Sequence, residues 1–112
     1  LRKKLQHETR ELFVAVYLNR ANRILGMETI SIGGITGTVA DARIILKKAI
    51  EAQASSIVLS HNHPSGSLKP SDADRQLTVK IKAAAQLIDM TVVDHIIVSD
   101  QGYYSFADSG EM

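Results

Sequence analysis

Apolar residues fall into short runs along the chain, separated by turn residues, and their spacing predicts alternating strands and helices. A near-continuous apolar run at residues 12–18 predicts a strand buried on both faces. Residues 19–22 are typical of a turn, so residues 23–32 are expected to return as a second strand beside the first. A loop is expected next, at Gly33, Gly34 and Gly37.

Two later segments show helical spacing. A helix is predicted from Thr38 to Ala54, with Thr38 as its cap and one apolar stripe made of Ala42, Ile45, Leu46, Ala49 and Ile50. Ser71 is predicted to begin a second helix, whose inner face would carry Leu77, Ile81, Ala84, Ala85 and Ile88.

Three further apolar runs predict strands at residues 56–60, 91–99 and 103–106. Helices alternate with most of these strands, but the first two strands form a hairpin. The sequence therefore predicts an α/β fold in which helices pack on the faces of a mixed sheet.

Length and composition limit the domain organisation and the class of protein. A chain of 112 residues holds one domain, and we expect residues 1–10 to be a polar lead-in and 11–112 the domain. Because the sequence begins at Leu1 and not at Met, we expect a fragment of a longer protein. Cysteine is absent, which excludes thiolate metal sites and favours a cytoplasmic location.

Charge and hydropathy give little indication of a nucleic-acid or membrane partner. The net charge is +1, so no broad basic surface is expected to hold nucleic acid by counterion release. No apolar run approaches the about 20 residues that a membrane span requires. Exposed strand edges are candidate surfaces for a peptide substrate or for self-association.

Candidate chemistry is concentrated between residues 61 and 74. If His61 and His63 continue the strand before them, both imidazoles leave the same face, about 6 to 7 Å apart at the backbone. The loop that follows can then bring Asp74 back as a third ligand. Three protein ligands with a fourth position left to water are typical of catalytic zinc. Ser71 would lie beside Asp74 as a donor to an oxyanion.

A structural interpretation of the same residues stays open. Ser71 and Asp74 also have the spacing of a capping box, and one helix start can serve both purposes. Asp94 and His95 are either hydrogen-bonded structural residues or partners that orient a metal-bound imidazole. A zinc deaminase is excluded, because His63 replaces the required glutamate and cysteine ligands are absent.

The run His61-Asn62-His63-Pro64, six residues, Ser71, two residues, Asp74 resembles the JAMM metalloprotease motif. The sequences at 61–66 and 94–98 further resemble the RadC branch of that family. The resemblance implies a three-layer fold like that of JAMM proteins and cytidine deaminases. It also implies Zn²⁺ held by His61, His63 and Asp74, with Ser71 near the water.

The resemblance further implies a catalytic glutamate at the start of the first core strand. Glu11 matches that place, and Glu28 is the competing residue. The expected function is zinc-dependent hydrolysis of an amide or isopeptide bond in a peptide or protein. The alternatives are a non-catalytic module stabilised by metal and an accessory domain in DNA repair.

Overall fold

The computed structural model describes residues 11–33 and 40–112. Five strands lie in these ranges: β1 (Glu11–Leu18), β2 (Ile24–Gly33), β3 (Ser56–Asn62), β4 (Thr91–Ser99) and β5 (Gly102–Ser105). They are accompanied by two helices, α2 (Ala42–Glu51) and α3 (Asp72–Leu87). Every strand expected from the sequence is present, and each boundary lies within two residues of the prediction.

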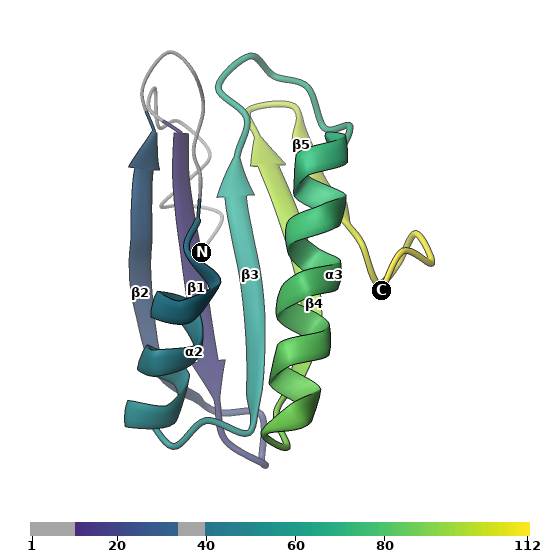
Figure 1. Cartoon of the computed structure of the whole chain (residues 1–112). Helices are drawn as coiled ribbons and strands as arrows, with labels where there is room; N and C mark the ends of the chain where they lie inside the picture. Colours follow the sequence, from purple (N-terminus) through teal and green to yellow (C-terminus); the bar gives the residue numbers. More distant parts are fainter. Residues whose placement is uncertain (1–10, 34–39) are drawn as a thin grey trace.

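The strands form one sheet in the order β2-β1-β3-β4-β5. Strands β3 and β4 are parallel and the other neighbours are antiparallel, so the predicted mixed α/β sheet and its β1–β2 hairpin are confirmed. Helix α3 is the crossover that parallel pairing requires. Both helices cover the same face of the sheet (Figure 1), so the described residues form two layers and do not test the three-layer expectation.

The main core lies between this face and the two helices. Alternate residues of β1 and β3 point into it, among them Phe13, Tyr17 and Ile57. Tyr17 also donates a hydrogen bond from its hydroxyl to the carbonyl oxygen of Ile45 at 2.9 Å, which attaches α2 to β1. A second, smaller cluster on the opposite face contains Leu12, Val14 and Val98.

The start of α2 differs from the prediction. Its N-cap is Asp41, whose carboxylate accepts a hydrogen bond from the Arg43 backbone N–H at 2.9 Å. Thr38 lies outside the described residues, but Ala40 and Asp41 are not helical, so a helix beginning at Thr38 is wrong. Ile50, expected on the apolar stripe, is exposed.

Helix α3 begins where the sequence predicts. Ser71 is its N-cap, with Asp74 completing a reciprocal capping box. The inner face carries Ile81 and Ala85 as expected. Ile88, which was also expected there, is exposed, and Thr78, which was not, is buried. In the described ranges, no helix is long and apolar enough to cross a membrane.

We expect Ile81→Ala to lower the free energy of unfolding by about 2–5 kcal/mol, because Ile81 is fully buried and its truncation leaves a cavity. The matched control is Val79→Ala on the same helix, where the side chain is 68% exposed. Its effect should stay within about 0.5 kcal/mol. Urea denaturation measures both, and equal losses would contradict this description of the core.

Candidate metal site

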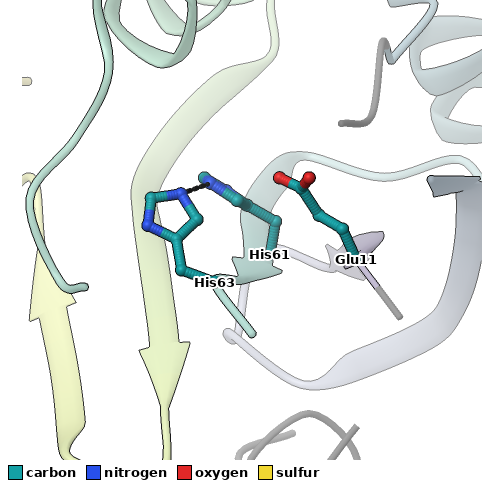
Figure 2. A group of neighbouring side chains, drawn as sticks. All are labelled: Glu11, His61 and His63. Carbon is teal, nitrogen blue, oxygen red and sulfur yellow. Dashed lines mark hydrogen bonds between the residues drawn. The ribbon is translucent and has the colours of Figure 1, made fainter. Parts of the chain in front are cut away.

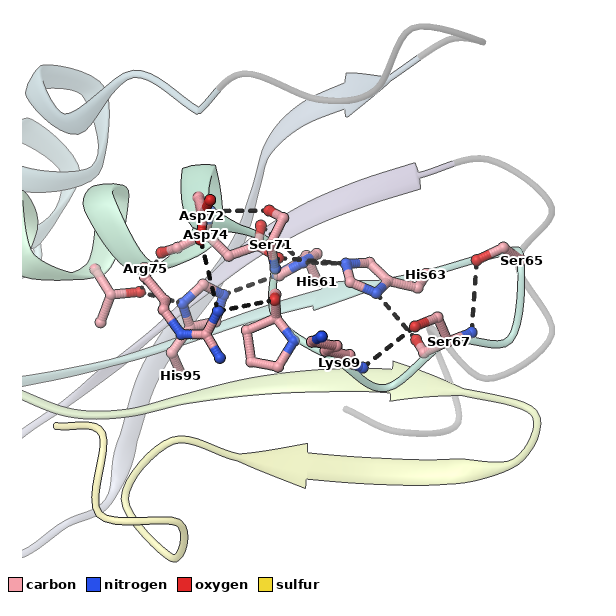
Figure 3. A network of polar contacts seen from close by, with 12 residues as sticks. His61, His63, Ser65, Ser67, Lys69, Ser71, Asp72, Asp74, Arg75 and His95 are labelled. Carbon is pink, nitrogen blue, oxygen red and sulfur yellow. Dashed lines mark hydrogen bonds and ion pairs between the residues drawn. The ribbon is translucent and has the colours of Figure 1, made fainter.

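Two histidines and one carboxylate converge at the end of β3. The Nε2 atoms of His61 and His63 are 2.9 Å apart. Asp74 Oδ1 lies 3.3 Å from His61 Nε2, and Asp74 Oδ2 lies 3.5 Å from His63 Nε2. The structure thus brings together the three residues that the sequence named as candidate ligands, as Figure 3 shows from close by.

Local structure explains why both imidazoles reach one point. His61 is in β3 and His63 follows its last residue, so the two side chains share a face while Asn62 between them does not. Asn62 accepts a hydrogen bond from the Leu12 N–H at 2.6 Å, which holds the end of β3 against the start of β1. The Phe13 ring stacks on His61, with ring centroids 5.7 Å apart.

His63 is oriented by the loop that follows it. Its Nδ1 lies 3.0 Å from the carbonyl oxygen of Ser67. A carbonyl oxygen only accepts hydrogen bonds, so Nδ1 carries a hydrogen and donates it. The Nε2 atom of the neutral ring therefore presents a lone pair toward His61 and Asp74.

The charges of the cluster depend on one another. Burial alone would raise the pKa of Asp74, but the contacts with His61 and His63, whose Nε2 atoms donate to the carboxylate when the rings are protonated, overcome burial and lower it. The hydrogen bond to Asp74 raises the pKa of His63, against the opposing effect of burial. Asp74 is therefore an anion, and it attracts a positive charge to the space between the two rings.

Glu11 lies on the other side of His61 from His63 in the view of Figure 2. One carboxylate oxygen of Glu11 and one nitrogen from each histidine all lie within 4.8 Å of one another, so these three residues could hold a metal ion. The carboxylate oxygens of Asp74 also lie within 4.8 Å of both histidines, at 3.3 Å from His61 Nε2 and 3.5 Å from His63 Nε2. Glu28, the competing glutamate, lies 3.7 Å from Lys48 in an ion pair and is not a member of this cluster.

Ser71 lies beside Asp74 through the capping box. Its Oγ accepts a hydrogen bond from the Asp74 N–H at 3.0 Å, and its own N–H donates to Asp74 Oδ2 at 2.8 Å. The cap thus orients the carboxylate that faces the histidines. These two bonds do not use the hydroxyl hydrogen of Ser71.

Residues 1–111 match the family of RadC-like JAB domains. The chain belongs to this family. UPF0758 proteins from Flavobacterium johnsoniae and Streptococcus gordonii are 43% and 42% identical to it, over 96% and 100% of the chain but only 45% and 50% of their own lengths. The UPF0758 protein YfjY of Escherichia coli K12 is 40% identical over 98% of the chain and 69% of its own length. The chain thus spans about half the length of most of these relatives.

Two buried polar residues of this RadC-like domain adjoin the cluster. His95 Nε2 lies 2.8 Å from His61 Nδ1, and Thr78 Oγ1 lies 2.6 Å from His95 Nδ1. Burial, together with the nearby charge of His61, lowers the pKa of His95 to about 3, so its ring is neutral. Sequence reasoning considered His95 but missed Thr78, whose position four residues after Asp74 was the available signal.

Asp94 has a structural role as a hydrogen-bond acceptor. Its Oδ1 accepts hydrogen bonds from the backbone N–H groups of His95 and Ala107, and its Oδ2 accepts one from the Ser105 hydroxyl. These bonds hold the segment after β5 against β4. Phe106, within that segment, stacks on His95 with ring centroids 4.7 Å apart.

We expect the domain to bind one zinc ion and to gain thermal stability from it, about 2.7 kcal/mol at a free zinc concentration 100 times the dissociation constant. Asp74→Asn should weaken binding, since it removes the anion beside both histidines. Asp72→Asn is the matched control, because Asp72 lies in the same helical turn with a 96% exposed side chain. Isothermal titration of all three proteins is the measurement, and equal affinities would contradict the assignment.

The metal-free domain should lose stability as the pH rises above about 6.5. The pKa of His63 is raised in the folded state, so its contribution is complete below the unfolded pKa and is lost as the pH rises through the folded one. Melting temperatures with chelator at pH 6 and pH 8 measure this loss. Asp74→Asn should reduce the difference between the two pH values, and an unchanged difference would contradict the pairing.

Proposed function

We propose that this RadC-like domain is a zinc-dependent hydrolase of the JAMM type, cleaving an amide or isopeptide bond in a peptide or protein. The convergence of His61, His63 and Asp74 is the observation that carries the proposal. This arrangement has the geometry of a binding site, because it directs three donor atoms to one point.

The donor set fits zinc. Zinc prefers imidazole nitrogen and carboxylate oxygen at about 2.0–2.2 Å in a tetrahedron, which sets neighbouring donors about 3.3 Å apart. The observed separations of 2.9, 3.3 and 3.5 Å lie close to that value. We propose His61, His63 and Asp74 as the ligands, since these three are in direct contact.

Glu11 is proposed as the general acid and base. When bound, zinc supplies a Lewis acid that polarises a carbonyl and lowers the pKa of a water molecule to about 7. Glu11 lies near enough to both histidines to take the proton of a water between them and hand it to the leaving amine. The Ser71 hydroxyl, beside Asp74, is proposed to donate a hydrogen bond to the carbonyl oxygen as negative charge develops there.

The long edge strand β2 offers a surface where an extended peptide could add to the sheet, or where two copies of the domain could pair. The absence of cysteine favours the cytoplasm as the place of action. The near-zero net charge gives no support for direct binding to DNA.

One observation favours a second candidate function, a non-catalytic module stabilised by metal. Glu11 is close enough to the histidines to serve as a fourth protein ligand, and four protein ligands close a zinc site to substrate. The two candidates differ in what Glu11 does. A catalytic Glu11 can be lost without loss of metal, whereas a fourth ligand cannot.

We expect Glu11→Gln to lower the rate of hydrolysis about 100- to 10,000-fold while zinc stoichiometry stays at one, because the amide keeps the shape but cannot accept the proton. The probe is a fluorogenic peptide library containing both α-amide and ε-lysyl isopeptide bonds. Zinc content is measured on the same samples.

Glu28→Gln is the matched control, since Glu28 pairs with Lys48 outside the cluster and should be dispensable for activity. His63→Ala should abolish both zinc binding and hydrolysis. Hydrolysis that persisted in both Glu11→Gln and His63→Ala would contradict the enzyme proposal. Loss of zinc from Glu11→Gln would favour the structural module.

A further inference from the structure

A buried chain of side chains leads from the candidate ligand His61 back to helix α3. His61 Nδ1 contacts His95 Nε2 at 2.8 Å, and His95 Nδ1 contacts Thr78 Oγ1 at 2.6 Å. Thr78 Oγ1 in turn lies 2.8 Å from the carbonyl oxygen of Asp74. Thr78 and both rings are almost fully removed from solvent.

The directions of these bonds follow from the one hydroxyl hydrogen that threonine has. The Asp74 carbonyl can only accept, so Thr78 donates its hydrogen there. Thr78 Oγ1 must then accept from His95, which requires a hydrogen on His95 Nδ1.

The tautomer of His95 sets the direction of its bond to the candidate ligand His61. The neutral His95 ring holds its hydrogen on Nδ1, so its Nε2 has a lone pair and accepts from His61 Nδ1–H. His61 is then left with a lone pair on Nε2, the atom that faces His63 and Asp74.

We propose that Thr78 is a positioning residue that sets the tautomers of His95 and His61, so that His61 presents an unprotonated Nε2 to a metal ion. This inference deepens the proposed function and rests on its choice of His61 as a ligand. Thr78 acts through His95, which lies between its hydroxyl and the candidate ligand His61.

Helix α3 carries both the candidate ligand Asp74 and the positioning residue Thr78. Asp74 and Thr78 are four residues apart and therefore on the same face of α3. Asp74 supplies the carboxylate at the site, while its backbone carbonyl fixes the direction of the Thr78 hydroxyl. The capping box at Ser71 sets the position of this whole helical turn.

Surrounding residues fix the orientation of the His95 ring. Its ring stacks on Phe106, and the Phe13 ring contacts it edge-on at a centroid distance of 5.6 Å. Its two ring nitrogens contact His61 and Thr78. Metal-bound histidines usually donate to a carboxylate, a backbone carbonyl or water, so a neutral histidine held by a threonine is an unusual partner.

The first test needs no variant. Long-range ¹H–¹⁵N correlation spectra of the wild-type domain report which imidazole nitrogen carries the hydrogen. We expect His95 to show a protonated Nδ1 and an unprotonated Nε2 at neutral pH, and His61 to show the same pattern once zinc is bound. A protonated Nε2 on His95 would overturn the inference.

The second test measures zinc affinity by competition with a chromophoric chelator. Thr78→Val keeps the side-chain shape but cannot accept from His95, so the hydrogen on that ring shifts to Nε2 and forces the His61 hydrogen onto the atom that should bind zinc. We expect affinity to fall about 10- to 100-fold, the usual effect of losing an outer partner of a ligand. Thr78→Ser keeps the hydroxyl and should restore affinity to within a few-fold of wild type.

Thr91→Val is the matched control, because it makes the same chemical change at an exposed position at the start of β4. It should leave zinc affinity unchanged. Equal affinities for wild type and Thr78→Val would overturn the inference while leaving the hydrolase proposal in place. If the wild type bound zinc in the expected tautomers but hydrolysed no member of the peptide library, the hydrolase proposal would fail and this inference would stand.

Discussion

The close approach of two imidazole nitrogens is the contact on which the rest of the site depends. His61 Nε2 and His63 Nε2 are 2.9 Å apart, and both face the carboxylate of Asp74. Hydrogen bonds on the far side of each ring direct a lone pair into this space. Two lone pairs at this distance repel unless a positive charge lies between them. The site is therefore arranged for a proton or for a metal cation, and three convergent donors favour the metal.

The fold brings these groups together with few elements. The alternation of a strand puts His61 and His63 on one face, and the crossover from β3 to β4 returns the chain as α3. The capping box fixes the first turn of that helix, so Asp74 arrives at a defined position. In the antiparallel pairing of β1 with β3, Phe13 lies opposite His61, so the start of β1 at Glu11 lies at the same end of the sheet as the histidines. Secondary structure, more than loop conformation, thus determines the geometry of the site.

Local spacing carried much of this information in the sequence. The pattern around His61 and His63 needs only a strand followed by a loop, and Ser71 with Asp74 needs only a helix start. These features depend on neighbouring residues, so the sequence could predict them. The start of α2 was missed because several residues before it can cap a helix, and only the contact between Asp41 and Arg43 shows which one does.

The part that Thr78 and His95 play depends on tertiary packing. Their contact joins a helix to a strand 17 residues away. The contact of His95 with His61 in turn depends on the β3–β4 register, which shifts between Ile57 and Val58. No local pattern encodes that shift. The sequence pattern also gave no reason to single out Thr78, since Leu77 and Ile81 account for the apolar face of the helix without it. Residues that act through another side chain are thus harder to find from sequence than residues with a fixed spacing.

The most direct test of the metal site is a crystal structure of the zinc-loaded domain with anomalous diffraction at the zinc edge. The proposed ligand set predicts a single strong peak bonded to Nε2 of His61, Nε2 of His63 and one oxygen of Asp74, with Glu11 held one water molecule away. A peak at another position, or a bond from Glu11 that closes the coordination with four protein ligands, would contradict it.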